Sequence, residues 1–169
     1  MNAAQRRRLI LEYLSAADRP LSAAALAQKL SVSRQIIVGD VALLRAGGSP
    51  ITATPRGYVL DRPQMGQTFT AACLHSPEDM ERELTLMVDQ GCTVVDVVVE
   101  HSVYGQLTGP LELSSRYDVS EFIRKVKESA AKPLSGLTGG IHLHTLRCPD
   151  RETFDRTVRA LDEAGFLAR

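Results

Sequence analysis

Tryptophan is absent from this 169-residue sequence, and aromatic residues make up only 5% of it. Cysteine is scarce too, because Cys73, Cys92 and Cys148 are the complete set, and they lack CxxC spacing. An odd number of scattered cysteines argues against a disulfide framework and favours small buried thiols in a reducing cytoplasm. There is no secretory leader and no apolar run near the ~20 residues that cross a bilayer. We therefore expect a cytoplasmic protein with no membrane partner.

The sequence also lacks GxGxxG, P-loop, HExxH and GxSxG motifs, so the common nucleotide-binding and hydrolase signatures are missing. Net charge is zero, but the charged residues are unevenly placed. Residues 1–62 carry nine Lys or Arg against four Asp or Glu, whereas residues 63–169 carry eleven against sixteen. A basic segment followed by an acidic one predicts that the front part of the chain meets a polyanion.

Residues 1–62 are predicted to form a winged helix-turn-helix DNA-binding domain. Apolar residues at helical spacing, with turn residues at the ends, indicate three helices followed by a β-hairpin. The expected helices begin at Arg6, run from the N-cap Ser22 to Leu30, and cover Gln35–Ala46. The expected strands of the hairpin are Ile51–Thr54 and Tyr58–Leu60. This segment resembles the helix-turn-helix of biotin-ligase-like repressors, with Leu-Ser-Val-Ser-Arg-Gln, Val-Ala-Leu-Leu-Arg and Ala-Thr-Pro-Arg-Gly-Tyr as matching elements.

In such a domain the third helix enters the major groove, and the side chains at its N-terminal end face the base edges. Ser33, Arg34 and Gln35 are those residues, and Arg56 at the tip of the hairpin is placed for a phosphate or the minor groove. A winged helix used for protein contacts is the alternative. The basic balance and the Arg-tipped turn favour DNA.

Pro and Gly in residues 61–67 break the pattern and predict a domain boundary, so a second domain is expected over residues 66–169. Its elements follow the order strand, helix, strand, strand, helix, strand, helix, strand. This order is typical of an α+β layer with helices over one face of a mixed or antiparallel sheet. Within it, Ser76 and Asp118 are the expected N-caps of the first two helices, and the strand Thr93–His101 should place Val95, Val97, Val99 and His101 on one face.

The strand around His142 and His144 carries the strongest chemical signal of the second domain. Successive side chains of a strand point to opposite faces, so Ile141 and Leu143 are expected in the core while both imidazoles stand on the other face. There they are close enough to bind one metal ion. Glu83, on the helix after Ser76, is either a further ligand or a rim residue that reaches water. His75 favours the first alternative, because a strand end and the second turn of the helix that follows can face each other.

These motifs together resemble the three-histidine (3H) domain repressors of the NiaR group. The resemblance rests on His75 and Glu83, then His-Ser-Val-Tyr-Gly at 101–105, Ser-Arg-Tyr-Asp-Val at 115–119 and His-Leu-His-Thr at 142–145, and it covers nearly the whole chain. It implies a nicotinate-responsive repressor of NAD synthesis or niacin uptake genes, and not an enzyme. It also implies an open-faced, HPr-like α/β sandwich as the regulatory domain. Ser102 is a departure, because the family often has proline there.

The resemblance further implies a divalent transition metal bound by His75, Glu83, His142 and His144. Nickel or zinc is expected, and iron or cobalt also suits three imidazoles and a carboxylate. His101, Tyr104 and Arg116 are candidate contacts to nicotinate, with Arg116 forming a two-pronged hydrogen bond to its carboxylate. Alternatively, Arg116 stabilises the turn before the Asp118 helix and Tyr104 only packs.

The expected partners are nicotinate and operator DNA, with a homodimer that spans two half-sites about 34 Å apart. Two other functions remain open. A metalloenzyme of the amide hydrolase type, fused to a DNA-binding domain, could use an open coordination position to activate water. A repressor that senses the metal alone would need no organic ligand.

Overall fold

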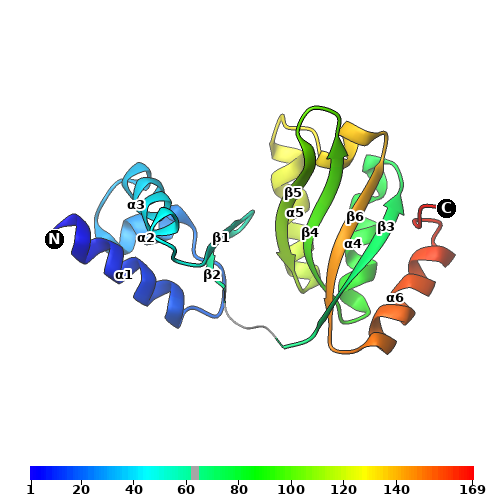
Figure 1. The fold of residues 1–169 in the computed structure, drawn as a ribbon, viewed down its shortest axis with the longest axis horizontal. Helices are drawn as coiled ribbons and strands as arrows, with labels where there is room; N and C mark the ends of the chain where they lie inside the picture. Colours follow the sequence, from blue (N-terminus) through cyan, green and yellow to red (C-terminus); the bar gives the residue numbers. More distant parts are fainter. Residues whose placement is uncertain (62–64) are drawn as a thin grey trace. The chain divides into compact units, whose positions relative to one another are not determined.

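The computed structural model describes residues 1–61 and 65–169, and the chain divides into two compact units, residues 1–63 and 64–169 (Figure 1). Each unit has a hydrophobic core of its own. Arg62, at the end of the predicted first domain, lies outside the described residues. In the part of the chain that the structure describes, no helix has the length and apolar character needed to cross a membrane.

The first unit is the predicted winged helix-turn-helix. Its elements are α1 (Ala3–Ala16), α2 (Ala23–Leu30), α3 (Arg34–Ala46), β1 (Ile51–Thr54) and β2 (Gly57–Leu60). The hydroxyls of Ser22 and Ser33 accept hydrogen bonds from backbone N–H groups in the first turns of α2 and α3. The third helix therefore begins one residue earlier than expected. Apolar side chains from the three helices and from β1 fill the core, among them Ile10, Leu26, Ile37 and Ile51.

The second unit is a four-stranded antiparallel sheet with helices on one face. Its elements are β3 (Gln67–Leu74), α4 (Met80–Asp89), β4 (Thr93–His101), β5 (Gly105–Leu113), α5 (Arg116–Glu128), β6 (Ile141–Cys148) and α6 (Arg151–Glu163), with short 3-10 turns at Pro77–Asp79 and Leu134–Thr138. The strand order is β3-β6-β4-β5. Side chains of α4, α5 and α6 share a core with one face of the sheet, and Figure 1 shows α4 and α5 behind it. The predicted open-faced α+β sandwich is confirmed.

The two faces of β6 are the reverse of the prediction. His142 and His144 do alternate with Ile141 and Leu143, but the histidines are buried at 3% exposure beneath the helices. Ile141 is 52% exposed and Leu143 37%. The reason lies further along the strand, where Leu146 and Cys148 continue the histidine row and are fully buried, whereas Thr145 and Arg147 continue the other row. Because Leu146 and Cys148 are buried at the end of β6, the face that they share with the histidines enters the core.

Several local details also differ from the prediction. Ser76 precedes the 3-10 turn Pro77–Asp79 and makes no side-chain cap hydrogen bond, and Asp79 is the N-cap of α4. In place of the expected last strand, the described residues after α6 form an isolated bridge between Leu167 and Cys73.

The register of β4 and the start of α5 differ as well. A bulge between Val94 and Asp96 shifts the register of β4, so that Val94, and not Val95, joins Val97 and Val99 on the core face. Helix α5 begins at Arg116 with Ser115 as its N-cap, and Asp118 lies in its first turn. The Asp118 carboxylate instead accepts hydrogen bonds from the backbone N–H and hydroxyl of Ser114.

Two glycines of the first unit give opposite predictions for replacement by alanine. Gly57 has φ +137°, and a Cβ there would lie 2.5 Å from the backbone of Leu21, which pairs with Tyr58. Gly39 lies on the exposed side of α3, and its Cβ would meet no atom within 4 Å. We expect Gly57→Ala to destabilise the first unit by about 1–3 kcal/mol. We expect Gly39→Ala to stabilise it by about 0.5–1 kcal/mol.

Hydrogen exchange of the α1–α3 amides in the full chain measures both changes. Equal protection of the Gly57→Ala variant and the original chain would contradict the docking of the hairpin onto the residues before α2.

Candidate functional site

The four predicted ligands meet inside the second unit. His75 follows β3, Glu83 lies in the first turn of α4, and His142 and His144 lie on β6. The Glu83 carboxylate is 2.8 Å from Nε2 of His75, 3.1 Å from Nε2 of His142 and 3.3 Å from Nε2 of His144. All four side chains are at most 3% exposed. Glu83 is therefore not a rim residue.

Strand geometry accounts for the way the three rings converge. Cys73 pairs directly with His142 across β3 and β6, so His75, two residues later, lies on the same face as both β6 histidines. The rings pack edge to face, with centroids 4.9 Å apart for His75–His142 and for His142–His144. Helix α4 covers this face and carries Glu83 onto the rings.

Backbone carbonyls hold all three rings by the nitrogen that faces away from Glu83. Nδ1 of His75 is 2.7 Å from the carbonyl oxygen of Ser76, and Nδ1 of His142 is 2.8 Å from that of Gly140. Nδ1 of His144 is 2.8 Å from the carbonyl of Asp96, at the bulge in β4. A carbonyl only accepts, so each Nδ1 carries a hydrogen, and a ring that is neutral then presents an Nε2 lone pair to the centre. Metal-binding histidines are oriented in this way.

The centre of the cluster is consequently rich in acceptors. Three Nε2 lone pairs face a carboxylate that is itself only an acceptor, so neutral rings cannot hydrogen-bond to it. Protonating all three rings would bury three positive charges against one negative charge, which is costly. Nε2 of His75 illustrates the conflict, because it is buried and has no well-aligned hydrogen bond although Glu83 Oε2 is 2.8 Å away. A single divalent cation would satisfy all four groups.

Electrostatics keep the carboxylate ionised. Burial alone would raise the pKa of Glu83, but hydrogen bonds with His142, His144 and His75, which need a proton on Nε2, outweigh burial and hold that pKa far below its usual range. Burial likewise opposes a charge on His75, yet the nearby Glu83 raises the pKa of His75 overall. At neutral pH Glu83 is thus an anion ready to bind a cation, and imidazole with carboxylate donors suits zinc, nickel, iron or cobalt.

One residue at this centre was not predicted. Cys73 is fully buried, and its Sγ, a Glu83 oxygen and a His142 nitrogen all lie within 4.8 Å of one another. Burial, and next the Glu83 charge, raise the pKa of its thiol. The signal was present in the sequence, since Cys73 precedes His75 by two residues and so shares its strand face. All three cysteines are free and buried, as predicted.

His101 lies at the end of β4 beside a hollow of about 630 Å³. The hollow is also lined by His142 and by the polar residues Ser102, Gln106 and Thr138. Nδ1 of His101 accepts hydrogen bonds from the backbone N–H groups of residues 103 and 104, so its Nε2 carries the hydrogen, the opposite tautomer from the buried three. Tyr104 stacks on His101 but is 74% exposed.

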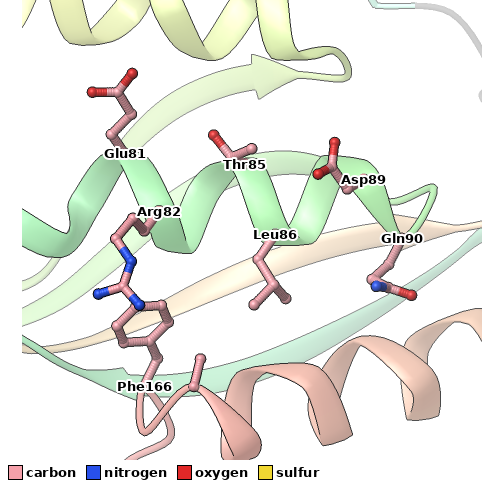
Figure 2. A pocket seen from close by; sticks show the side chains of 8 residues that line it. Glu81, Arg82, Thr85, Leu86, Asp89, Gln90 and Phe166 are labelled. Atoms are coloured by element: carbon pink, nitrogen blue, oxygen red, sulfur yellow. The ribbon is translucent and has the colours of Figure 1, made fainter.

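The structure does not bring Arg116 to the cluster. Its guanidinium makes two hydrogen bonds, of 2.7 and 2.6 Å, to the carboxylate of Asp89 on α4. Asp89 lines a different hollow, on the outer side of α4, where Figure 2 shows Arg82 beside Phe166. Of the two roles considered for Arg116, the observed one is structural, because it ties the start of α5 to α4.

The predicted DNA-contacting residues lie at two points of the first unit. Ser33, Arg34 and Gln35 are exposed at the start of α3, although the Ser33 hydroxyl is engaged as the helix cap. Arg56 is half-buried in the turn between β1 and β2. Part of the basic charge is structural, because Arg6 and Arg7 of α1 form ion pairs with Asp40. That carboxylate is buried in α3, so these pairs hold α1 against α3.

Comparison with known proteins places these features in context. Residues 68–169 match the 3H domain family, and residues 6–59 match an HTH domain family. The chain is 46% identical to the transcription repressor NadR of Bacillus subtilis (strain 168), over 98% of this chain and 94% of that protein. It is 44% identical to the probable transcription repressor NiaR of Thermotoga maritima, over 96% of this chain and 93% of that protein.

The cluster predicts how the stability of the metal-free protein depends on pH. Glu83 has a lowered pKa, so its contribution is present above its unfolded pKa of about 4.5 and is lost as the pH falls. His75 has a raised pKa, so its contribution is complete below about 6.5 and is lost as the pH rises through the folded value. Unfolding by urea in a chelator should show greatest stability of the second unit between these limits.

Glu83→Gln should remove the loss of stability on the alkaline side, because no carboxylate remains to hold the proton on His75. A metal-free original chain that is as stable at pH 9 as at pH 6 would contradict the coupling.

Proposed function

The chain belongs to the 3H-domain family of transcription repressors, and from that premise we propose that it represses genes of NAD synthesis or niacin uptake, with nicotinate as corepressor. The observation that carries the proposal is the convergence of three Nε2 lone pairs and one carboxylate in a unit joined to a winged helix. An acceptor-only centre of this kind gives a regulatory unit a metal-dependent state. The curated relatives are repressors, which supports a regulatory role over an enzymatic one.

In this proposal the first unit binds operator DNA as part of a homodimer. The exposed start of α3 enters the major groove, where Arg34 and Gln35 contact base edges, and Ser33 contributes by capping the helix. Gly39 supports this orientation. A glycine inside a helix lowers the stability of that helix, and a Cβ at Gly39 would meet no neighbouring atom, so packing within the protein does not require glycine there. A bare backbone on the exposed side of α3 allows DNA to approach closely. Arg56 would contact phosphate from the hairpin.

The second unit would hold one divalent transition metal, nickel or zinc in the first place, with iron or cobalt also suited to the donors. His75, Glu83, His142 and His144 are its ligands in this proposal. The bound metal would supply a Lewis-acid position able to accept a pyridine nitrogen. The protein's part is to keep the three rings in one tautomer through the carbonyls of residues 76, 140 and 96, and to exclude water from the carboxylate.

Nicotinate would occupy the hollow beside His101. His142 lines this hollow and also belongs to the cluster, so a ligand there would lie next to the metal. No Arg or Lys is among the described residues that line it. The Nε2–H of His101 is therefore the proposed donor to the carboxylate, in place of Arg116, which is paired with Asp89. The exposed Leu137, Ile141 and Leu143 offer apolar contact to the ring.

Operator binding by metal-loaded protein, with and without nicotinate, tests the proposal. We expect nicotinate to tighten operator binding by roughly 5–150-fold, the usual range of coupling between two sites. Linkage then requires operator DNA to tighten nicotinate binding by the same factor. His144→Ala should abolish the nicotinate response and leave basal DNA binding nearly unchanged, because it removes a metal ligand and no DNA contact.

Matched variants separate the two units. Thr145→Ala, one residue further along β6 and on its opposite face, should keep the response. Arg34→Ala should weaken DNA binding about tenfold or more with and without nicotinate. Arg159→Ala removes an exposed positive charge from α6 and should leave DNA binding unchanged. Unchanged operator affinity at saturating nicotinate would refute the corepressor role, and affinity that follows the metal alone would identify a metal sensor. Turnover of nicotinamide would instead indicate an enzyme.

A further inference from the structure

We propose that Cys73 is a fifth ligand of the metal centre, so that a thiolate joins the three imidazoles and the carboxylate. This inference rests on the metal site proposed above and concerns its chemistry. A sulfur ligand changes which metal the protein selects and gives the centre a spectroscopic signature of its own.

Position is the first argument. Cys73 lies on β3 directly opposite His142 and two residues before His75, with its side chain on the helix-covered face. Its Sγ, a Glu83 oxygen and a His142 nitrogen are all within 4.8 Å of one another. Ligands bound to one zinc-sized ion at about 2.0–2.3 Å are separated by at most about 4.6 Å. The three donors therefore nearly fit around one ion as they stand.

The second argument comes from His75, the strand neighbour of Cys73. The His75 side chain is 3% exposed, and its Nε2 has no well-aligned hydrogen-bond partner although it points at the same carboxylate. A buried, unpartnered nitrogen next to a buried sulfur marks a position that a cation would fill. Cys73 on β3 and His75, which directly follows that strand, both face Glu83.

Cys92 and Cys148 offer a comparison, because their thiols lie away from the proposed metal site. Sγ of Cys92 and Sγ of Cys148 are 2.7 Å apart at the far end of β6, and Cys92 also contacts the hydroxyl of Thr157. The polar partner of the Cys73 thiol is Glu83, the carboxylate that the three histidines also face. A thiol that only donates to Glu83 is the competing role, and it predicts no bond from sulfur to metal.

Thiolate ligation has a chemical consequence. The S–H proton passes to solvent as the sulfur binds the metal, so loading releases a proton in addition to any lost by the imidazoles. Soft sulfur donors favour zinc over hard cations such as manganese or magnesium. The centre should therefore discriminate against hard divalent ions more strongly than three imidazoles and a carboxylate would.

Cobalt(II), added to the metal-free full-length chain, is the probe. We expect visible d–d bands that saturate at one equivalent, accompanied by an intense near-ultraviolet sulfur-to-cobalt charge-transfer band. Cys73→Ser should lose the near-ultraviolet band and keep the visible bands. Cys73→Ala gives the same test should the serine variant not fold. Cys92→Ser is the matched control, and it should keep both sets of bands.

The outcomes separate this inference from the metal site on which it rests. Visible bands without the charge-transfer band in the original chain would overturn the role of Cys73 and leave the four-ligand site intact. A charge-transfer band that survives in Cys73→Ser would also overturn it, because the sulfur would then come from another residue. If no cobalt binds at all, both the proposed metal site and the fifth ligand fail.

Discussion

Three imidazole nitrogens and one carboxylate, all buried, face each other in the second unit, and no neutral ring held through its Nδ1–H can donate to that carboxylate. Several local contacts hold the three rings and the carboxylate in this arrangement. The bulge in β4 brings the carbonyl of Asp96 to Nδ1 of His144. Gly140 lets the start of β6 pass close to the strand before α4, because a Cβ there would lie 2.8 Å from the carbonyl oxygen of His75. A cation at the centre would relieve the conflict that these contacts create.

In the proposed metal site, the same arrangement would let a bound ion influence the order of the second unit. Its members come from the end of β3, the first turn of α4 and the start of β6, so one bound ion would tie three elements together. Without the ion, the elements meet at groups that oppose each other unless protons are taken up. The order of this part of the unit would then depend on metal. His142 belongs to the cluster and also lines the hollow beside His101. Ligand binding in the hollow and order at the cluster would thereby be linked.

Sequence reasoning predicted the order of the helices and of every strand but the expected last one, the winged helix and the four members of the cluster, because strand alternation and helical spacing are local properties. It failed where the strand was read over too few residues or where residues distant in the sequence decide. The burial of His142 in place of Ile141 follows from Leu146 and from the α4 helix that covers the sheet. Arg116 pairs with Asp89, which lies 27 residues earlier in the chain, and no local sequence pattern predicts that ion pair. Cys73 was overlooked because a buried thiol has an ordinary packing role.

Imidazole nitrogen chemical shifts, measured by NMR during zinc titration of the metal-free full-length chain, test the central claim most directly. We expect Nδ1–H tautomers for His75, His142 and His144, with all three Nε2 resonances shifting together and saturating at one equivalent of zinc. His101, held as the Nε2–H tautomer, provides the internal reference and should stay unchanged. Nε2 resonances of the three buried rings that do not respond to zinc would contradict the account.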